Sequence, residues 1–166
     1  MKYVEGDLFD GIAPFICKKT VLIPHLTNNV RVWKSNFALR LGRKHPEAVA
    51  AFFRKKDNQL GITQFVQDEN LPVIICNMFA QDDIKSSEDS ICVNYKYLRL
   101  CMDQVAGRVY GLRQQGVEPV IACPKFGCDV GGDWNIIEKM ILEVWSDLEV
   151  VVYFPKSSDS ENRNSA

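Results

Sequence analysis

Two runs of this chain are continuously apolar, Val73–Cys76 and Val150–Val152. A strand exposed on one face alternates apolar and polar residues, so a continuous apolar run indicates a strand that is covered on both faces. Strands of this kind belong to sheets that carry helices on each side. This feature therefore favours an α/β protein over an all-β one.

Six segments are predicted to be strands, and helices alternate with them. The predicted strands are Tyr3–Glu5, Val21–Pro24, Thr63–Gln67, Val73–Cys76, Val120–Cys123 and Val150–Phe154. One amphipathic helix should begin at Pro46, a second should carry the apolar stripe Leu98–Leu112 and end before Gly116, and a third should begin near Asp133. The pattern predicts the α/β class, with helices covering a central sheet.

Length and composition indicate one domain, which we place at residues 1–155. The polar tail 156–166 is expected to be disordered, because it cannot contribute to an apolar core. A net charge of −1 argues against general nucleic-acid binding, which usually requires a basic face. No apolar run is long enough to span a membrane, and no secretory signal is evident, so we expect a cytoplasmic protein. The oligomeric state is not predicted.

The six cysteines form no C-x-x-C pair. Cys76 and Cys123 lie inside apolar runs, where a free cysteine behaves as a small hydrophobic residue. Only His25 and His45 are available as imidazole ligands, and structural zinc sites show a characteristic ligand spacing. We therefore expect no metal site and no cofactor, and reduced cysteines as in the cytoplasm.

The stretch from Ala122 to Trp145 joins an apolar strand to an amphipathic helix through a turn with Gly127, Gly131 and Gly132. Glycines let a ligand approach the backbone closely, and the first N–H groups of a helix have no internal partners. Such a junction is suited to an anion, most often a phosphate. The alternative is a tight turn that needs glycine for its own geometry.

Three more polar loops follow predicted strands: Gly6-Asp7-Leu8, His25–Phe37 and Asn77–Asp82. The Asp7 carboxylate could accept a hydrogen bond from an exocyclic amine, or it could cap the next turn. His25 could contact a ligand, or it could bond a backbone carbonyl. If the strands are parallel, all four loops converge on one edge of the sheet, where α/β proteins bind ligands.

These motifs, in this order, resemble a macro domain, an α/β/α module that binds ADP-ribose. Gly6-Asp7-Leu8 resembles the motif whose Asp meets the adenine amine. His25–Phe37 resembles a first binding loop of the H-x-x-N-x-x-G-x-W-G-x-G-F type, found in a subgroup with ADP-ribose 1″-phosphate phosphatases and short viral proteins. Asn77–Gln81 resembles that subgroup's next segment, Phe126–Trp134 the pyrophosphate-facing second loop, and Val150–Tyr153 the closing strand. The resemblance implies a three-layer α/β/α sandwich with a central, mostly parallel, six-stranded mixed sheet.

The resemblance also implies an ADP-ribose-type nucleotide as the partner and assigns residues to it. The implied ligand-binding residues are Asp7, Leu8, Asn28, Asn29, Arg31, Lys34, Asn36, Phe37, Gln81, Phe126, Gly127, Cys128, Val130, Gly131 and Gly132. If the protein hydrolyses its ligand, His25 and Asp129 are the acid–base candidates.

The sequence departs from this family pattern in both loops. Arg31, Lys34 and Asn36 stand where the first loop has glycines, so the distal pocket should be narrower, although Arg31 and Lys34 offer cations to a phosphate. The second loop is one residue shorter and places Asp129 where a phosphate would approach. We therefore predict a reader or sequestering protein for ADP-ribose or a derivative with another distal group. The alternatives are a hydrolase of ADP-ribose 1″-phosphate or an ADP-ribosyl ester, and a degenerate macro fold used as a protein-interaction surface.

Overall fold

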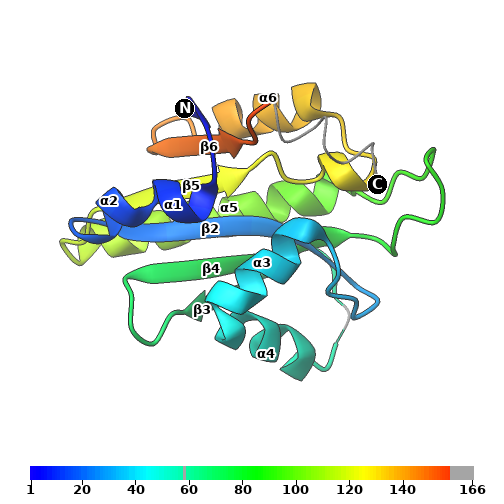
Figure 1. The fold of residues 1–166 in the computed structure, drawn as a ribbon, viewed down its shortest axis with the longest axis horizontal. Helices are drawn as coiled ribbons and strands as arrows, with labels where there is room; N and C mark the ends of the chain where they lie inside the picture. Colours follow the sequence, from blue (N-terminus) through cyan, green and yellow to red (C-terminus); the bar gives the residue numbers. More distant parts are fainter. Residues whose placement is uncertain (58, 158–166) are drawn as a thin grey trace.

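The computed structural model describes residues 1–57 and 59–157, which fold around one six-stranded sheet (Figure 1). The strands are β1 (Lys2–Glu5), β2 (Thr20–Asn28), β3 (Thr63–Gln67), β4 (Val73–Gln81), β5 (Pro119–Pro124) and β6 (Val150–Phe154). They lie in the order β1-β6-β5-β2-β4-β3, and every neighbouring pair is parallel except β3 with β4. The mixed, mostly parallel sheet predicted from the sequence is confirmed.

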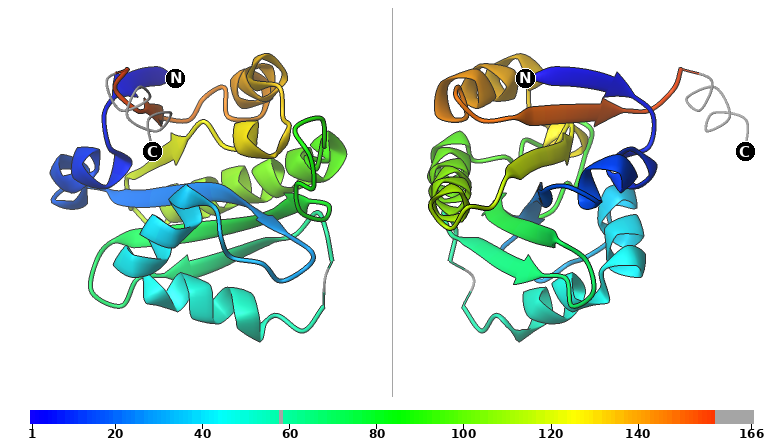
Figure 2. Two further views of the ribbon diagram at one scale, coloured as in Figure 1. Left: turned by 45° about the vertical axis from the view of Figure 1, so that its right-hand side comes forward. Right: turned by 90° about the vertical axis from the view of Figure 1, so that its left-hand side faces the viewer.

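Helices cover both faces of this sheet. They are α1 (Leu8–Gly11), α2 (Ala13–Ile16), α3 (Asn36–Lys44), α4 (Pro46–Arg54), α5 (Tyr95–Gln114), α6 (Trp134–Val144) and a short 3₁₀ helix, η1 (Cys128–Val130). The right-hand view of Figure 2 shows α5 and α6 on one side of the sheet and α3 and α4 on the other. The three-layer sandwich is therefore also confirmed.

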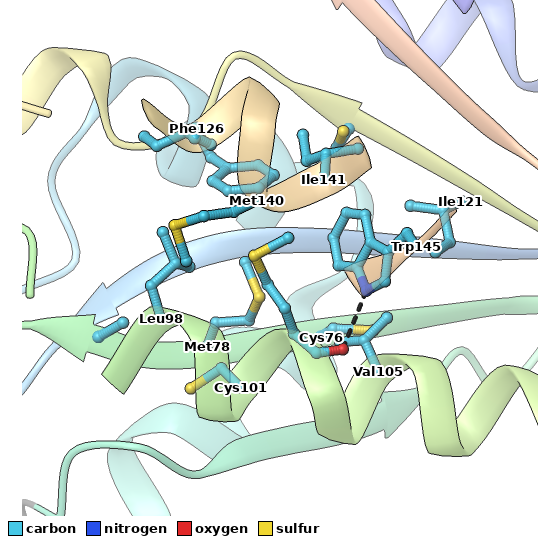
Figure 3. Close-up of a cluster of buried hydrophobic side chains, with 14 of the residues drawn as sticks. Cys76, Met78, Leu98, Cys101, Val105, Ile121, Phe126, Met140, Ile141 and Trp145 are labelled. Atoms are coloured by element: carbon cyan, nitrogen blue, oxygen red, sulfur yellow. Dashed lines mark hydrogen bonds between the residues drawn. The ribbon is translucent and has the colours of Figure 1, made fainter. Parts of the chain in front are cut away.

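Each central strand contributes to two cores, which explains the continuous apolar runs. In β2, Leu22 faces the core under α5 and α6, whereas Val21 and Ile23 face the core under α1 to α4. In the first core the indole N–H of Trp145 donates to the carbonyl oxygen of Met102 at 2.9 Å (Figure 3). The two cores fix the sheet between rigid layers, and this frame positions the loops at the strand ends.

The three predicted helices form, and their ends follow from local chemistry. Asn94 and Asp133 cap α5 and α6, since each side chain accepts a backbone N–H of the first turn. Gly116 closes α5 at a φ of +78°, a conformation that suits glycine. Pro46 begins α4 as expected; the sequence pattern places Val49, Phe52 and Phe53 on its apolar face, but Phe53 is 43% exposed.

Two predicted strands extend further than the sequence indicated. β2 continues through His25 to Asn28, and β4 continues through Asn77 to Gln81, with every residue of β4 buried. These polar residues were assigned to loops, but hydrogen bonds to other parts of the chain let them stay inside. Helix α3 was not predicted; Ser35 caps it by accepting the N–H of Ala38 at 3.1 Å.

The polar, turn-rich sequence Gln81–Ser90 predicts a surface loop, and a loop does follow β4, although Gln81 itself ends the strand. Most of the tail predicted to be disordered, 158–166, lies outside the described residues. Among the helices that are described, none has both the length and the apolar character needed to cross a bilayer.

Candidate functional site

Two adjoining cavities open at the edge of the sheet where the parallel strands end. The first, of about 580 Å³, lies between the segment after β2, the end of β4 and the loop after β5; we call it the His25 cavity. The second, of about 950 Å³, lies between the segments after β1 and β6 and helix α3; we call it the Asp7 cavity. Asn36, Phe37 and Pro124 line both cavities. The convergence of four loops predicted for parallel strands is therefore present.

The residues proposed from the sequence divide between these cavities. The His25 cavity is lined by His25, Asn28, Lys34, Asn36, Phe37, Gln81, Phe126, Gly127, Cys128, Asp129 and Val130. Asp7 and Leu8 line the Asp7 cavity, together with Asn36 and Phe37. Asn29, Arg31, Gly131 and Gly132 line neither.

In the Asp7 cavity, both carboxylate oxygens of Asp7 are engaged. One accepts the N–H groups of Phe9 (2.8 Å) and Asp10 (3.2 Å), so Asp7 caps α1, and the other accepts a hydrogen bond from Arg40. The Arg40 guanidinium also lies 5.3 Å from the centre of the Phe9 ring, and that ring stacks on Phe37 at 5.6 Å. The helix-capping alternative is thus observed, and Arg40 is a neighbour that the sequence did not indicate.

The Asp7–Arg40 pair does not close this cavity to a ligand. The Arg40 side chain is 52% exposed, and ion pairs in contact with water contribute about 0–1 kcal/mol. An exocyclic amine can therefore replace the guanidinium at low cost, while the capping oxygen stays in place.

Two adjacent asparagines hold the shape of the loop that follows β2. Asn28 bonds twice to Val32, since its Nδ2 donates to the carbonyl oxygen (2.6 Å) and its Oδ1 accepts the N–H (3.0 Å). Asn29 donates to the Asp82 carboxylate and accepts the N–H of Asp83, both at 2.8 Å. These amide groups are used within the chain, so they organise the rim of the His25 cavity.

The side chains that replace family glycines in the first loop point to different places. Arg31 keeps the left-handed backbone, with a φ of +60°, but its guanidinium donates to the carbonyl oxygens of Phe53 and Lys55 beside the end of α4. Arg31 lines neither cavity in this structure, and its contact with a phosphate stays a prediction. Lys34 and Asn36 do line the His25 cavity, as expected for side chains that narrow it.

His25 is a buried, neutral hydrogen-bonding group. Its Nε2 lies 2.6 Å from Oδ1 of Asn77. The Asn77 amide nitrogen donates to Oε1 of Gln64 (3.0 Å) and to the carbonyl of Ala48 (3.3 Å), so its oxygen is the acceptor and the His25 proton resides on Nε2. Burial lowers the pKa of His25 to about 4, despite the opposing bond to Asn77. At neutral pH its ring therefore lacks the second proton that a general acid needs.

The glycines of the second loop are required by packing within the protein. Gly127 has a φ of +86°, and its carbonyl accepts the N–H groups of Val130 (3.2 Å) and Gly132 (2.9 Å). A Cβ on Gly131 would lie 2.3 Å from the backbone oxygen of Ser90 in the loop after β4. These glycines are therefore needed for the geometry of a tight turn. The same turn lines the His25 cavity, so it is also placed where it could bind an anion.

Cations outnumber carboxylates around the His25 cavity. Lys34, Lys85 and Lys125 line it, and Asp129 is the one acidic residue among its described lining residues. The neighbouring Cys128 is exposed as a residue, but its thiol is partly buried. This burial raises the pKa of the Cys128 thiol and disfavours the thiolate that a nucleophile would need. The cavity is therefore suited electrostatically to an anion.

Among the charged lining residues that sequence reasoning missed are Lys85 and Lys125 in the His25 cavity and Arg40 in the Asp7 cavity, which Glu5, Asp10 and Lys156 also line. Lys85 belongs to a loop predicted only as surface, and Arg40 to a helix that was not predicted. Lys125 precedes the second loop, and its ammonium lies 5.6–5.9 Å from three aromatic ring centres. The spacing of lysines and arginines along the chain carries no signal of which ones the fold gathers.

No protein-family model and no curated protein sequence matches this chain. Solved structures do. A protein from Bacteroides thetaiotaomicron is 26% identical with a TM-score of 0.76, over 94% of this chain and 99% of that one. A macrodomain protein from Streptomyces coelicolor is 28% identical with a TM-score of 0.72, over 92% of this chain and 97% of that one.

A third match is DarTG from Thermosipho africanus, solved in complex with ADP-ribose. It is 16% identical with a TM-score of 0.67, over 95% of this chain and 42% of that one. Together these structures show that the chain has the macrodomain fold, as its motifs indicated. The narrower subgroup of phosphatases and short viral proteins stays a prediction.

Proposed function

We propose that this protein binds an ADP-ribose-type nucleotide across the two adjoining cavities and acts as a reader or sequestering protein. The adenosine end would occupy the Asp7 cavity, and the phosphates and the distal group would occupy the His25 cavity. The observation that carries the proposal is the pair of cavities joined at Asn36 and Phe37, one lined by the Asp7 carboxylate and the other by three lysines.

The electrostatics support an anionic ligand in the His25 cavity. Lys34, Lys85 and Lys125 give it three positive charges against the single carboxylate of Asp129. Clefts lined by one sign of charge concentrate ligands of the opposite sign. A macrodomain of similar fold, DarTG from Thermosipho africanus, was solved with ADP-ribose, which has two phosphates.

Binding without rapid turnover fits the acid–base groups better than hydrolysis does. Hydrolysis needs a positioned water, a base beside it and donors aimed at the developing charge. Burial lowers the pKa of His25 to about 4, so at neutral pH the ring has no second proton to give as a general acid and is a weak base. Asp129 lies on an exposed turn, where we find no hydrogen bond or ion pair within the described ranges. Neither residue is held as a catalytic pair requires.

The test is a calorimetric and thermal-shift comparison of ADP-ribose, ADP-ribose 1″-phosphate, NAD and AMP, with phosphate release measured in parallel. We expect saturable binding of ADP-ribose or one of its derivatives. A ligand at 100 times its dissociation constant should stabilise the fold by about 2.7 kcal/mol. If none of these ligands binds, the interaction-surface alternative is favoured. Multiple turnovers that require His25 or Asp129 would favour the hydrolase.

Asp7 should contribute strongly to the affinity for adenine nucleotides. We expect Asp7→Ala to weaken binding by about 1–3 kcal/mol, the scale of a hydrogen bond to a charged group. Asp7→Asn should lose less, because it keeps one acceptor oxygen, which can meet the amine or cap α1 but cannot do both. Arg40→Ala is the matched control: removing the competing guanidinium should leave the affinity unchanged or raise it by up to about 1 kcal/mol. If calorimetry gives the same nucleotide affinity for the parent and for both Asp7 variants, Asp7 does not contact the ligand.

A further inference from the structure

A second polar cluster lies outside both cavities, although the His45 ring is 6.5 Å from the ring of Phe9, which lines the Asp7 cavity. His45 joins α3 to α4, Glu47 is in the first turn of α4, and Asp68 directly follows β3. Because β3 runs antiparallel to β4, its last residue, Gln67, pairs with Ile74 near the beginning of β4. The cluster therefore sits at the opposite edge of the sheet, and none of its three members lines either cavity.

The three side chains converge on one point inside the protein. One ligand atom from each of His45, Glu47 and Asp68 lies within 4.8 Å of the other two. Nδ1 of His45 lies 2.7 Å from Oδ2 of Asp68, and these two side chains are only 4% and 8% exposed. Oδ1 of Asp68 accepts the N–H groups of Asn70 and Leu71, each at 2.8 Å. These bonds hold the Asp68 carboxylate in one orientation, which leaves Oδ2 directed at the cluster.

The third member of the cluster has an unused oxygen. Oε1 of Glu47 is shielded from solvent and has no hydrogen-bond partner among the described residues. A buried polar atom without a partner carries a substantial free-energy cost. The cost is greater here because Glu47, which is half-buried, lies beside the Asp68 carboxylate, and adjacent like charges are unfavourable unless positive charge lies between them.

We propose that His45, Glu47 and Asp68 form a binding site for a divalent first-row metal ion. One imidazole nitrogen and two carboxylate oxygens are a donor set that suits such ions. A divalent charge balances both carboxylates, and the ion gives the unpaired oxygen of Glu47 a partner. No cysteine belongs to the group in the described part of the chain, so the site differs from a thiolate zinc centre. The backbone donors on Asp68 would act as the supporting shell that orients a ligand.

A bound ion would stabilise the place where the junction of α3 and α4 meets the turn between β3 and β4. His45 ends α3 and precedes α4, whereas Asp68 belongs to the turn between β3 and β4. The bound ion would therefore tie segments that are 23 residues apart in sequence. Linear spacing shows no sign of this group, which explains why the sequence predicted no metal.

The experiment uses the full chain, stripped with a chelator and then titrated with Mn²⁺ or Co²⁺ in the absence of nucleotide. We expect one ion per chain by calorimetry and a rise in Tm of about 5–10 °C at 100 times the dissociation constant. Co²⁺ should give visible d–d bands without the near-ultraviolet thiolate band that binding at a cysteine would produce. Because no nucleotide is present, the result is independent of the proposed function.

Glu47→Gln is the matched variant, since it keeps the size of the side chain and removes one charged ligand. It should weaken Mn²⁺ binding by more than about tenfold, and His45→Gln should do the same for Co²⁺. Asp57→Asn, which changes an exposed carboxylate outside the cluster, should bind the ions as the parent does. Failure of the parent to bind either ion, or equal binding by the parent and Glu47→Gln, would overturn the proposal.

Discussion

Gly131→Ala should lower the free energy of unfolding by roughly 2–5 kcal/mol. The backbone at Gly131 has a φ of +84°, where a residue with a Cβ is less stable by about 1–2 kcal/mol. The new Cβ would also lie 2.3 Å from the carbonyl oxygen of Ser90 and 2.9 Å from Cα of Ile91. Both are backbone atoms, so the loop after β4 must move, and overpacking of this kind costs about 1–3 kcal/mol. Urea unfolding of the two proteins measures the difference.

Gly116→Ala separates the two contributions. Gly116 has a similar φ of +78°, but a Cβ there would meet nothing within 4 Å. This control should lose only the conformational part, about 1–2 kcal/mol. If the two variants unfold at the same urea concentration, the close approach of residue 131 to Ser90 does not contribute to the loss of stability.

The same contact links stability to the proposed binding site. The loop after β4 is held to the second loop by the bond from the Cys92 N–H to the Val130 carbonyl, at 2.9 Å. Lys85 of that loop and Asp129 of the second loop line the same cavity. Displacing the loop in Gly131→Ala should therefore also weaken binding of a phosphate-bearing ligand.

The apolar pattern predicted the layers of the fold well but misjudged where strands end. Val73–Cys76 was correctly predicted as a buried strand, because burial on both faces leaves a direct trace in the residue types. Asn77 was assigned to a loop because it is polar. In the structure it stays in the strand, since His25, Gln64 and Ala48 satisfy its amide. Polarity marks a strand end only where the polar group has no partner inside the fold.

The site was predictable in outline because strand direction fixes which loops meet. The individual contacts were not. Arg40 beside Asp7 depends on how α3 packs against the segment after β1, and Arg31 turns away to the end of α4. A motif specifies a position along the backbone, whereas the direction of a long charged side chain depends on neighbours that are distant in sequence. The same limit concealed the pairing of His45 with Asp68.

Lowering the pH from about 6.5 to about 4 should destabilise the protein through His25 by roughly 3 kcal/mol. The ordinary pKa of histidine is about 6.5, whereas burial lowers the pKa of His25 to about 4 in the folded protein. Between these values the unfolded chain binds a proton at this residue and the folded chain does not. The free energy of unfolding therefore rises with pH across this window and loses this contribution as the pH falls.

His25→Gln isolates this contribution, because glutamine can still donate to Asn77 but does not titrate. Urea unfolding of the parent and the variant at pH 7, 6, 5 and 4 should show that the parent loses roughly 3 kcal/mol more than the variant between pH 7 and pH 4. Every other titratable group is present in both proteins, so its effect cancels in the difference. Curves that stay parallel down to pH 4 would mean that His25 is protonated readily in the folded state. In that case His25 would be available as an acid in its cavity, and the argument against hydrolysis would lose its main support.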